Sequence, residues 1–426
     1  MMRILYAAGE GREAIFAPPP QEADVSQAVR DIIADVRTRG DAAVLAYTSR
    51  FDGAQLHSLQ VSAEEIEEAR AGVGDAFLAL LTEAAANIRA YHSRQLRDGF
   101  CEEFRPGVTL GQKVLPIGRV GLYVPGGTAS YPSSVLMNAI PALIAGCPAV
   151  QMVTPPGPDG RIAPSILAAA SVAGISAIFK VGGAQAVAAL AYGTASIPAV
   201  DKIVGPGNAY VAEAKRQVFG QVAIDMIAGP SEILIVADAH SDPRHLAADL
   251  LSQAEHDRLA SAVLVTDSEA LARAVQQEVE RQLIPLPRQA TARASIDQRG
   301  KIIVTDSLQQ AMDIANALAP EHLELCVAQP FEWLKQVVNA GSVFLGRDCP
   351  EAMGDYFAGT NHTLPTGGTA RFSSALSVDD FQKKIQFSAY AREAFLKEAP
   401  KVAAFARMEG LEAHARSVES RMEGQQ

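Results

Sequence analysis

Residues 149–181 read AVQMVTPPGPDGRIAPSILAAASVAGISAIFKV. Two short apolar runs, 149–153 and 177–181, stand on either side of a helix-length stretch rich in Ala, Gly and Ser. Neither run alternates with polar residues, which is typical of parallel strands that are covered on both faces. The segment therefore predicts a strand–helix–strand unit of a doubly wound α/β sheet.

The same alternation continues along the chain from residue 120. Further apolar runs stand at 120–124, 202–204, 232–237 and 261–266, separated mostly by helix-length stretches. Upstream, apolar spacing predicts helices over 24–39 and about 75–97, and Ser62 with Glu65 predicts a capping box. The last fifty residues, from Ser377, are predicted to be charged helices with no strand. The sequence thus favours an α/β protein with two successive sheet blocks and a helical C-terminal arm.

Composition narrows the class of protein. The chain has 426 residues, 48% of them hydrophobic, and 48 acidic against 37 basic residues give a formal charge of −11. This charge argues against nucleic acid or an anionic membrane surface as the main partner, because both require a basic footprint. The four cysteines form no CxxC pair, and the longest apolar run, 166–179, is too short to span a bilayer. We expect a soluble protein of the reducing cytoplasm.

Glycine-rich and proline-rich loops follow several of the predicted strands. They occupy 123–134, 181–186, 204–211 and 228–232, and they carry Tyr123, Gln185 and Asn208. Such loops lie at the carboxyl ends of parallel strands, where ligands bind and glycine lets the backbone approach a phosphate. None completes the GxGxxG dinucleotide fingerprint. Composition alone therefore leaves two readings open, a nucleotide site and ordinary tight turns.

Polar residues at the end of one predicted helix suggest a metal site. In 243-PRHLAADLLSQAEHD-257, Gln253 and His256 are three residues apart and would share one helix face. With Asp355 and one of the later histidines they would satisfy the ligand chemistry of zinc. Spacing does not show that these segments converge, and solvated histidine–acid neighbours are the alternative.

Adjacent Glu321 and His322 suggest acid–base chemistry. Both side chains could accept protons near neutral pH if they were partly buried. The alternative is that a proline followed by a polar pair simply ends a helix.

Taken together, these segments resemble the histidinol dehydrogenase family over nearly the whole chain. The resemblance is carried by GLYVPGG with YPSSVLMNAIPA, VGGAQA, VGPGNAYV, DMIAGPSEILIVAD, LLSQAEHD, APEHLEL, PEAMGDYFAGTNHTLPTGGTARFSS and EGLEAHARSVE. It implies that L-histidinol is oxidised through the aldehyde to L-histidine with two NAD⁺, the last step of histidine biosynthesis. It also implies two incomplete Rossmann-like domains.

The resemblance assigns roles to particular residues. Zinc would be held by Gln253, His256, Asp355 and His414, and these four would also contact the substrate. His322 would take the alcohol proton, and Glu321 would activate the water that hydrates the aldehyde. The remaining matches are substrate contacts at Ser231, His362 and Glu409, and NAD contacts at Tyr123, Gln185 and Asn208.

The resemblance also implies a domain plan and a partner. We expect an N-terminal arm at 1–22, a larger α/β domain at 23–122 plus 235–376, an NAD-contacting domain at 123–234, and a C-terminal arm at 377–426. In a homodimer the arm would bring Glu409 and His414 into the partner's site. Two rival functions are a zinc- and NAD-dependent dehydrogenase of another small alcohol, such as a sulfonated diol, and a non-catalytic nucleotide-binding paralogue.

Overall fold

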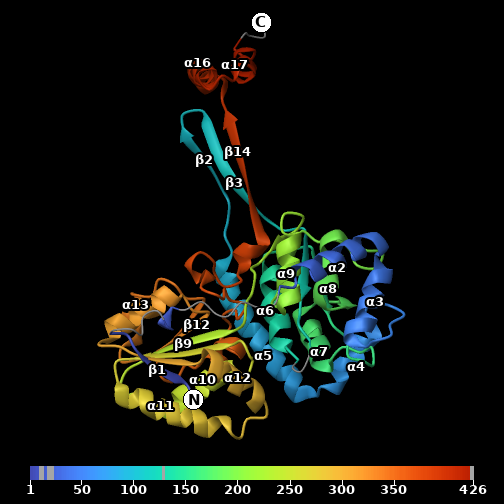
Figure 1. Cartoon of the computed structure of the whole chain (residues 1–426). Coiled ribbons are helices and arrows are strands. Elements are labelled where there is room, and N and C mark those ends of the chain that lie inside the picture. The colour runs from blue at the N-terminus through green and yellow to red at the C-terminus, as the bar shows by residue number, and fades with distance from the viewer. Residues whose placement is uncertain (9–13, 17–23, 127–129, 423–426) are drawn as a thin grey trace. The chain divides into compact units, whose positions relative to one another are not determined.

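The computed structural model describes residues 1–8, 14–16, 24–126 and 130–422 (Figure 1). The chain divides into two compact units, each described by itself below. The first unit comprises Met1–Gln95 and Ile117–Phe381, and the second comprises Leu96–Pro116 and Gln382–Gln426.

A six-stranded parallel sheet forms one part of the first unit, in the order β1-β11-β10-β9-β12-β13. Its strands are β1 (Arg3–Tyr6), β9 (Glu232–Ala237), β10 (Ser261–Thr266), β11 (Lys301–Val304), β12 (His322–Cys326) and β13 (Ser342–Leu345). The helices of this part are α10 (Pro243–Ala254), α11 (Glu269–Leu283), α12 (Gln289–Arg299), α13 (Leu308–Leu318), α14 (Pro330–Leu334) and α15 (Glu351–Tyr356). One apolar cluster joins the sheet to α10, α11 and α12, and another joins it to α13. The apolar runs thus became buried parallel strands, as predicted.

A five-stranded parallel sheet forms the other part, in the order β6-β5-β4-β7-β8. Its strands are β4 (Arg119–Tyr123), β5 (Ala149–Thr154), β6 (Ala177–Lys180), β7 (Lys202–Val204) and β8 (Ala223–Ile224). Helices α6 (Pro132–Ile144), α7 (Pro164–Ala173), α8 (Gly183–Tyr192) and α9 (Ala209–Val218) follow the strands. Residues 149–181 form the predicted unit, because β5 and β6 pair in parallel on either side of α7.

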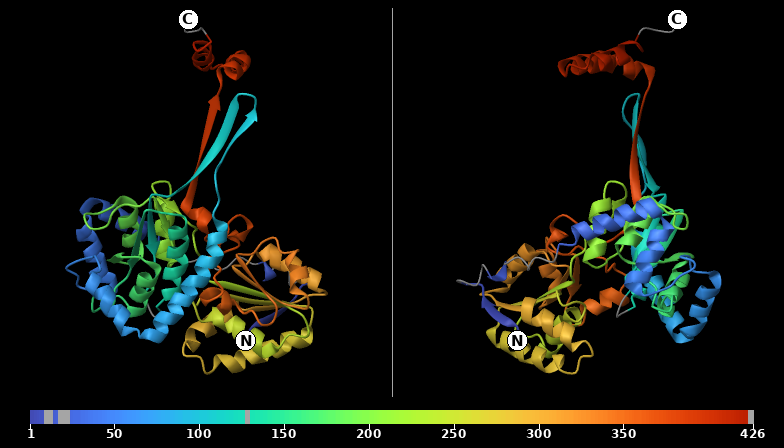
Figure 2. Two further views of the ribbon diagram at one scale, coloured as in Figure 1. Left: turned by 180° about the vertical axis from the view of Figure 1, so that it is seen from behind. Right: turned by 45° about the vertical axis from the view of Figure 1, so that its right-hand side comes forward.

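The N-terminal helices pack on the helices of this five-stranded sheet. They are α2 (Ser26–Arg39), α3 (Asp41–Asp52), α4 (Ala63–Gly72) and α5 (Asp75–His92). Apolar residues of α2 and α3 join the core around α8 and α9, whereas those of α4 and α5 join the core around α6 and α7. Figure 2 shows these blue helices against the green elements from two further sides. Helices α2 to α5 therefore lie against the helices of residues 132–218.

Local sequence signals account for several helix boundaries. The Ser62 and Glu65 capping box at the start of α4 is present as predicted. Helix α10 begins after Asp242, whose side chain accepts a hydrogen bond from the Arg244 N–H, and has Pro243 in its first turn. These signals give α10 a defined start, and its polar C-terminal end faces the site described below.

The second unit contains a three-stranded antiparallel sheet and two helices. The sheet has the order β14-β3-β2, formed by β2 (Phe100–Arg105), β3 (Val108–Pro116) and β14 (Gln382–Tyr390). Helices α16 (Arg392–Met408) and α17 (Glu412–Glu419) pack through Ala403, Ala406 and Ala415.

The prediction of a strand-free segment after Ser377 was wrong, because β14 lies within it. In β14 the apolar Ile385 and Phe387 alternate with polar residues, and nearly every side chain is exposed. Such a strand has no continuous apolar run. Its pairing with β3, more than 260 residues away along the chain, is what defines it.

Among the described residues, no single helix is both long and apolar enough to cross a membrane; the bent pair Ala63–Gly72 and Asp75–Gln95 meets the criterion of length and composition only when joined.

Candidate functional site

A cavity of about 2210 Å³ opens in the first unit, where loops after strands of both sheets meet. The four glycine-rich loops of the sequence all contribute to its lining, and so do the segments that carry the predicted catalytic pair and metal ligands. Ten of the twelve predicted site residues line it: Tyr123, Gln185, Asn208, Ser231, Gln253, His256, Glu321, His322, Asp355 and His362. The other two, Glu409 and His414, are exposed residues of the second unit.

The end of α10 supplies Gln253 and His256. Leu246, Leu250 and Leu251 on the apolar face of α10 are buried against the six-stranded sheet. This packing places the last turn of α10 at the cavity. His256 lies just past the helix end, and its N–H donates to the Gln253 carbonyl oxygen at 3.1 Å. The side chains of Gln253 and His256 therefore project from the same tight turn. This is close to the shared helix face that their spacing predicted.

The Gln253 side chain is fully buried and half satisfied. Its Nε2 lies 2.9 Å from His322 Nδ1, while its Oε1 has no hydrogen-bond partner. A buried carbonyl oxygen without a partner costs about 1–3 kcal/mol. Such an atom is suited to a ligand that supplies positive charge or a hydrogen-bond donor.

His322, the first residue of β12, lies at the centre of the charged groups. Its Nδ1 is also 3.0 Å from the Glu232 carbonyl oxygen, so it can donate there when protonated or accept from the Gln253 amide when not. Its Nε2 has no hydrogen-bond partner and lies 3.5 Å from Asp355 Oδ1. Burial lowers the pKa of His322, but Glu351 and Glu321 outweigh it and raise the pKa well above its usual value.

Glu321 precedes His322 and is buried as well. Its Oε2 accepts a hydrogen bond from the Glu232 N–H at 2.8 Å and lies 3.6 Å from His322 Nδ1. Burial raises the pKa of Glu321 to about 8, against the opposing effect of His322. A carboxyl with this pKa can exchange protons near neutral pH.

Three side chains bring possible metal ligands together. One ligand atom each from His322, Glu351 and Asp355 lies within 4.8 Å of the others. Glu351 was not predicted, although it stands four residues before Asp355 in α15, a spacing that places both carboxylates on one helix face. Burial raises the pKa of Glu351 to about 7, and its Oε2 has no hydrogen-bond partner.

The donor set around Asp355 suits zinc. The unpartnered amide oxygen of Gln253, the His256 imidazole and the Asp355 carboxylate provide the nitrogen and oxygen atoms that zinc accepts. Burial lowers the pKa of His256, which favours the neutral imidazole that a metal requires. His322 and His362 lower the pKa of Asp355 against its burial, which keeps this carboxylate ionised.

His362 extends the polar surface toward α6. Its Nδ1 lies 3.0 Å from the Asp355 carbonyl oxygen, and its Nε2 lies 3.1 Å from Ser134 Oγ. Because a carbonyl can only accept, Nδ1 carries the hydrogen and Nε2 accepts from the serine hydroxyl. Ser134 lies at the end of the loop 123–134, but sequence reasoning did not single it out.

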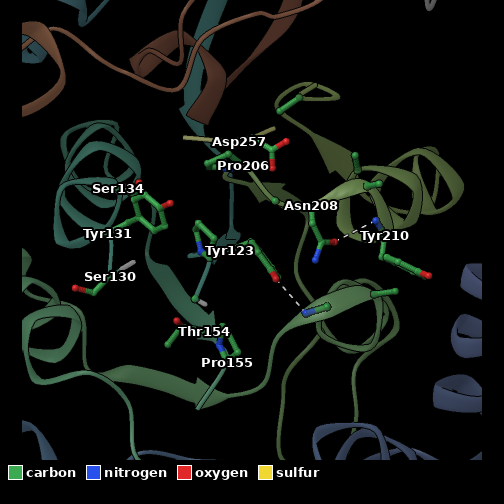
Figure 3. Close-up of a pocket in the computed structure, with 18 of the residues that line it drawn as sticks. Tyr123, Ser130, Tyr131, Ser134, Thr154, Pro155, Pro206, Asn208, Tyr210 and Asp257 are labelled. Carbon is green, nitrogen blue, oxygen red and sulfur yellow. Dashed lines mark hydrogen bonds between the residues drawn. The ribbon is translucent and has the colours of Figure 1, made fainter. Parts of the chain in front are cut away.

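The loops of the five-stranded sheet form the other side of the cavity (Figure 3). Tyr123 is buried, and its hydroxyl oxygen accepts from the Gly183 N–H at 3.0 Å. Asn208 caps α9, and its Oδ1 accepts from the N–H groups of Tyr210 and Val211 at 3.1 and 3.2 Å. The amide nitrogen of Asn208 is left for a ligand. Gln185 lines the same side, and its buried Oε1 has no hydrogen-bond partner.

A buried ion pair fixes the loop that carries Asn208. Lys215 on α9 pairs with Asp225, and both side chains are almost wholly buried. The Lys215 ammonium donates to the Gly205 carbonyl oxygen at 2.9 Å, while Asp225 Oδ2 accepts from the Gly205 N–H at 2.7 Å. Gly205 adopts a φ of +115°, and a Cβ there would overlap the Tyr123 carbonyl oxygen. Glycine is required at this position.

Comparison with known proteins identifies the family. A family model described as histidinol dehydrogenase matches residues 17–422. Histidinol dehydrogenase of Bacillus licheniformis is 57% identical over 395 residues, which cover 93% of each chain. The enzyme of Syntrophotalea carbinolica is 54% identical over 99% of each chain. A crystal structure of histidinol dehydrogenase from Elizabethkingia anophelis matches with a TM-score of 0.95 and 39% identity, covering 99% of this chain and 98% of that one. The chain therefore belongs to the histidinol dehydrogenase family of NAD-dependent oxidoreductases.

Proposed function

We propose that the chain oxidises L-histidinol to L-histidine through the aldehyde, with two NAD⁺ and one zinc ion. The observation that carries the proposal is the position of His322. Its Nε2 has no partner beside Asp355, in the cavity that the glycine-rich loops also line. An acid–base group, a metal-suited donor set and nucleotide-type loops thus share one space, which is what a metal-assisted hydride transfer requires.

Zinc would be held by Gln253, His256 and Asp355, with His414 of the partner subunit as the fourth protein ligand. When bound, it would anchor the nitrogen atoms of the substrate and so fix the carbinol carbon relative to the bases. A carboxylate oxygen of Glu351 lies within 4.8 Å of one of Asp355. An ionised Glu351 would therefore add negative potential around the Asp355 carboxylate. Ser231 and His362 line the same region and would contact the substrate.

His322 would serve as the base of the first oxidation. With hydrogen on Nδ1 and donated to the Glu232 carbonyl oxygen, Nε2 keeps its lone pair and can accept the alcohol proton. As that proton leaves, the C–H bond electrons go to NAD⁺ as hydride, and the products are aldehyde, NADH and imidazolium. The positively charged nicotinamide ring disfavours imidazolium before the reaction, which favours the neutral base.

Glu321 would serve the second oxidation. Its buried carboxylate would take a proton from water as the oxygen adds to the aldehyde carbon, while the His322 imidazolium would return its proton to the aldehyde oxygen, giving the hydrated diol. The diol would then give its hydride to a second NAD⁺ and a hydroxyl proton to the neutral His322. The carboxylic acid that results ionises to the carboxylate of L-histidine. The pKa of about 8 lets Glu321 accept and release this proton within the neutral range.

A homodimer would complete the site. The second unit exposes large apolar side chains, with Phe405 at 67% and Met408 at 88% of their full exposure. In the three-stranded sheet the outer strands β2 and β14 are almost wholly exposed, and such a sheet gains stability when another surface covers it. We infer that a second copy covers this unit and that Glu409 and His414 serve the partner's site.

The first experiment measures NADH formed per molecule of limiting L-histidinol, before and after metal chelation. We expect a yield of about two that is lost with the chelator and restored by zinc. A yield near one would refute the second oxidation. Turnover of another small alcohol in place of histidinol would refute the substrate assignment.

Ligand roles are tested separately by metal content. His256→Asn should lower bound zinc and activity together, while His245→Asn, which changes an exposed histidine of α10, should change neither. Full zinc content in the His256 variant would remove that residue from the ligand set.

Shared sites are tested by mixing subunits. Inactive His322→Asn and inactive His414→Asn chains should regain part of the activity after subunit exchange, because each mixed dimer has one intact site. No recovery despite measured exchange would contradict a site built from two subunits.

A further inference from the structure

Asp52 is a carboxylate of the cavity that none of the roles above uses. It is the last residue of α3, and the left-handed Gly53 (φ +71°) turns the chain directly after it. Its side chain lines the cavity, and its Oδ2 is shielded from solvent with no hydrogen-bond partner. A shielded acceptor at a cavity wall is poised for a donor from a ligand.

The position of Asp52 places it on the cofactor side. Helix α3 packs on α8 over the five-stranded sheet, in the core that contains Tyr123. Burial raises the pKa of the Tyr123 phenol, and Asp52 is close enough to raise it further electrostatically. The nicotinamide ring has to reach His322, which stands on the other sheet. The adenosine end of an extended dinucleotide is then the part that lies along α3.

Charge restricts which group of the dinucleotide can meet Asp52. The carboxylate stands at the carboxyl end of a helix, where the helix dipole adds negative potential, so a phosphate is repelled there. Ribose hydroxyls, in contrast, can donate to it.

Two of the arginines that line the cavity already have acidic partners, and a third stacks on an aromatic ring. Arg216 forms two hydrogen bonds of 2.8 Å with Glu213, and Arg161 lies 3.6 Å from Glu68. The Arg50 guanidinium lies over the Phe51 ring at 5.2 Å. The cavity wall therefore offers hydroxyl recognition more readily than a phosphate clamp.

We propose that Asp52 accepts a hydrogen bond from a hydroxyl of the adenosine ribose and thereby selects NAD⁺ over NADP⁺. The two cofactors differ only by the 2′-phosphate on this ribose, and an acidic side chain that binds the 2′-hydroxyl excludes the phosphate by charge and space. The inference rests on the proposed function, because it takes the dinucleotide to lie in this cavity.

The test measures binding of NADH and NADPH by fluorescence, without turnover. The wild type should bind NADH more tightly. In Asp52→Asn the preference for NADH should fall about tenfold, because a charge-assisted hydrogen bond and a repulsion are both removed. Asp313→Asn, which neutralises an exposed carboxylate of α13 that does not line the cavity, should leave the preference unchanged.

The outcomes separate this inference from the proposed function. A wild type that binds neither dinucleotide would overturn both. A wild type that prefers NADH, together with an Asp52→Asn variant that keeps the full preference, would overturn the role of Asp52 alone. Asp52→Ser is measured beside it, so that the result stands if one variant does not fold. Thermal unfolding identifies such a variant.

Discussion

The two walls of the cavity are built on opposite principles. On the side of the six-stranded sheet, Gln253 Oε1, His322 Nε2 and Glu351 Oε2 are buried without hydrogen-bond partners. On the side of the five-stranded sheet, the buried charges Lys215 and Asp225 satisfy each other and the backbone of Gly205. One wall holds the acid–base groups and metal-suited groups that need a ligand. The other holds a loop in a shape that a ligand can use, although Gln185 Oε1 and Asp52 Oδ2 on that side are also without partners. This contrast separates groups that can bind a ligand from groups that hold the backbone, because a fully hydrogen-bonded group has no free donor or acceptor.

The largest effect is expected on the reactive wall. His322→Asn should lower kcat about a thousandfold, the usual scale for loss of a positioned base, or about 4 kcal/mol of barrier. Asn is smaller than His and carries no charge, so we expect the variant to fold. Circular dichroism checks the fold. His245→Asn is the control, since that histidine is exposed on α10. A loss of less than tenfold would mean that His322 is not the base.

On the scaffold wall the corresponding change should act on stability. Lys215→Met leaves Asp225 buried without its cation, so the free energy of unfolding should fall by about 3–5 kcal/mol in urea titrations. The control is Lys335→Met, which breaks an exposed pair with Glu332 and should cost about 0–1 kcal/mol. Equal losses in the two variants would show that burial does not distinguish the pairs.

The close approach at Gly205 can be tested by adding one methyl group. Gly205→Ala would overlap the Tyr123 carbonyl oxygen at a positive φ, so we expect a loss of about 1–3 kcal/mol and weaker binding of NADH. Gly72→Ala is the matched control, because nothing lies within 4 Å of its added Cβ. Unfolding of both variants in urea gives the comparison. A neutral Gly205→Ala would mean that the loop moves freely.

The same contrast separates what the sequence could predict from what it could not. The parallel sheets follow from apolar runs such as 149–153, and the turn with Gln253 and His256 follows from the polar end of a helical pattern, because both are local features. Lys215 and Asp225 are only ten residues apart in the sequence, yet nothing in the local sequence indicates that either side chain is buried.

Other parts depend on contacts between distant segments. The short strand β1 joins the sheet only through β11, nearly 300 residues away, and β14 is defined only by its pairing with β3. The convergence of Glu351 with His322 likewise depends on the register of β12 against β13 and on the start of α15. Spacing along the chain contains no information about such registers, so these features came from the structure.

The smallest effect concerns Asp52, which belongs to the scaffold wall but resembles the reactive one. Burial raises the pKa of Asp52 to about 6, above its ordinary value of 3.8. A carboxyl whose pKa is higher in the folded state favours folding at low pH, and this advantage is lost as the pH rises from about 4 through 6. At pH 7.5 the ligand-free wild type therefore holds an ionised carboxylate at a cost, which Asp52→Asn removes. Solvent screening of this half-buried group limits the gain to about 1 kcal/mol. Urea unfolding at pH 5 and pH 7.5 should show the Asn variant of Asp52 more stable than the wild type by a margin that widens at the higher pH, whereas Asp313→Asn should show no such widening. A constant margin would mean that Asp52 is already satisfied without a ligand, and the two walls would then differ more than their unpartnered atoms indicate.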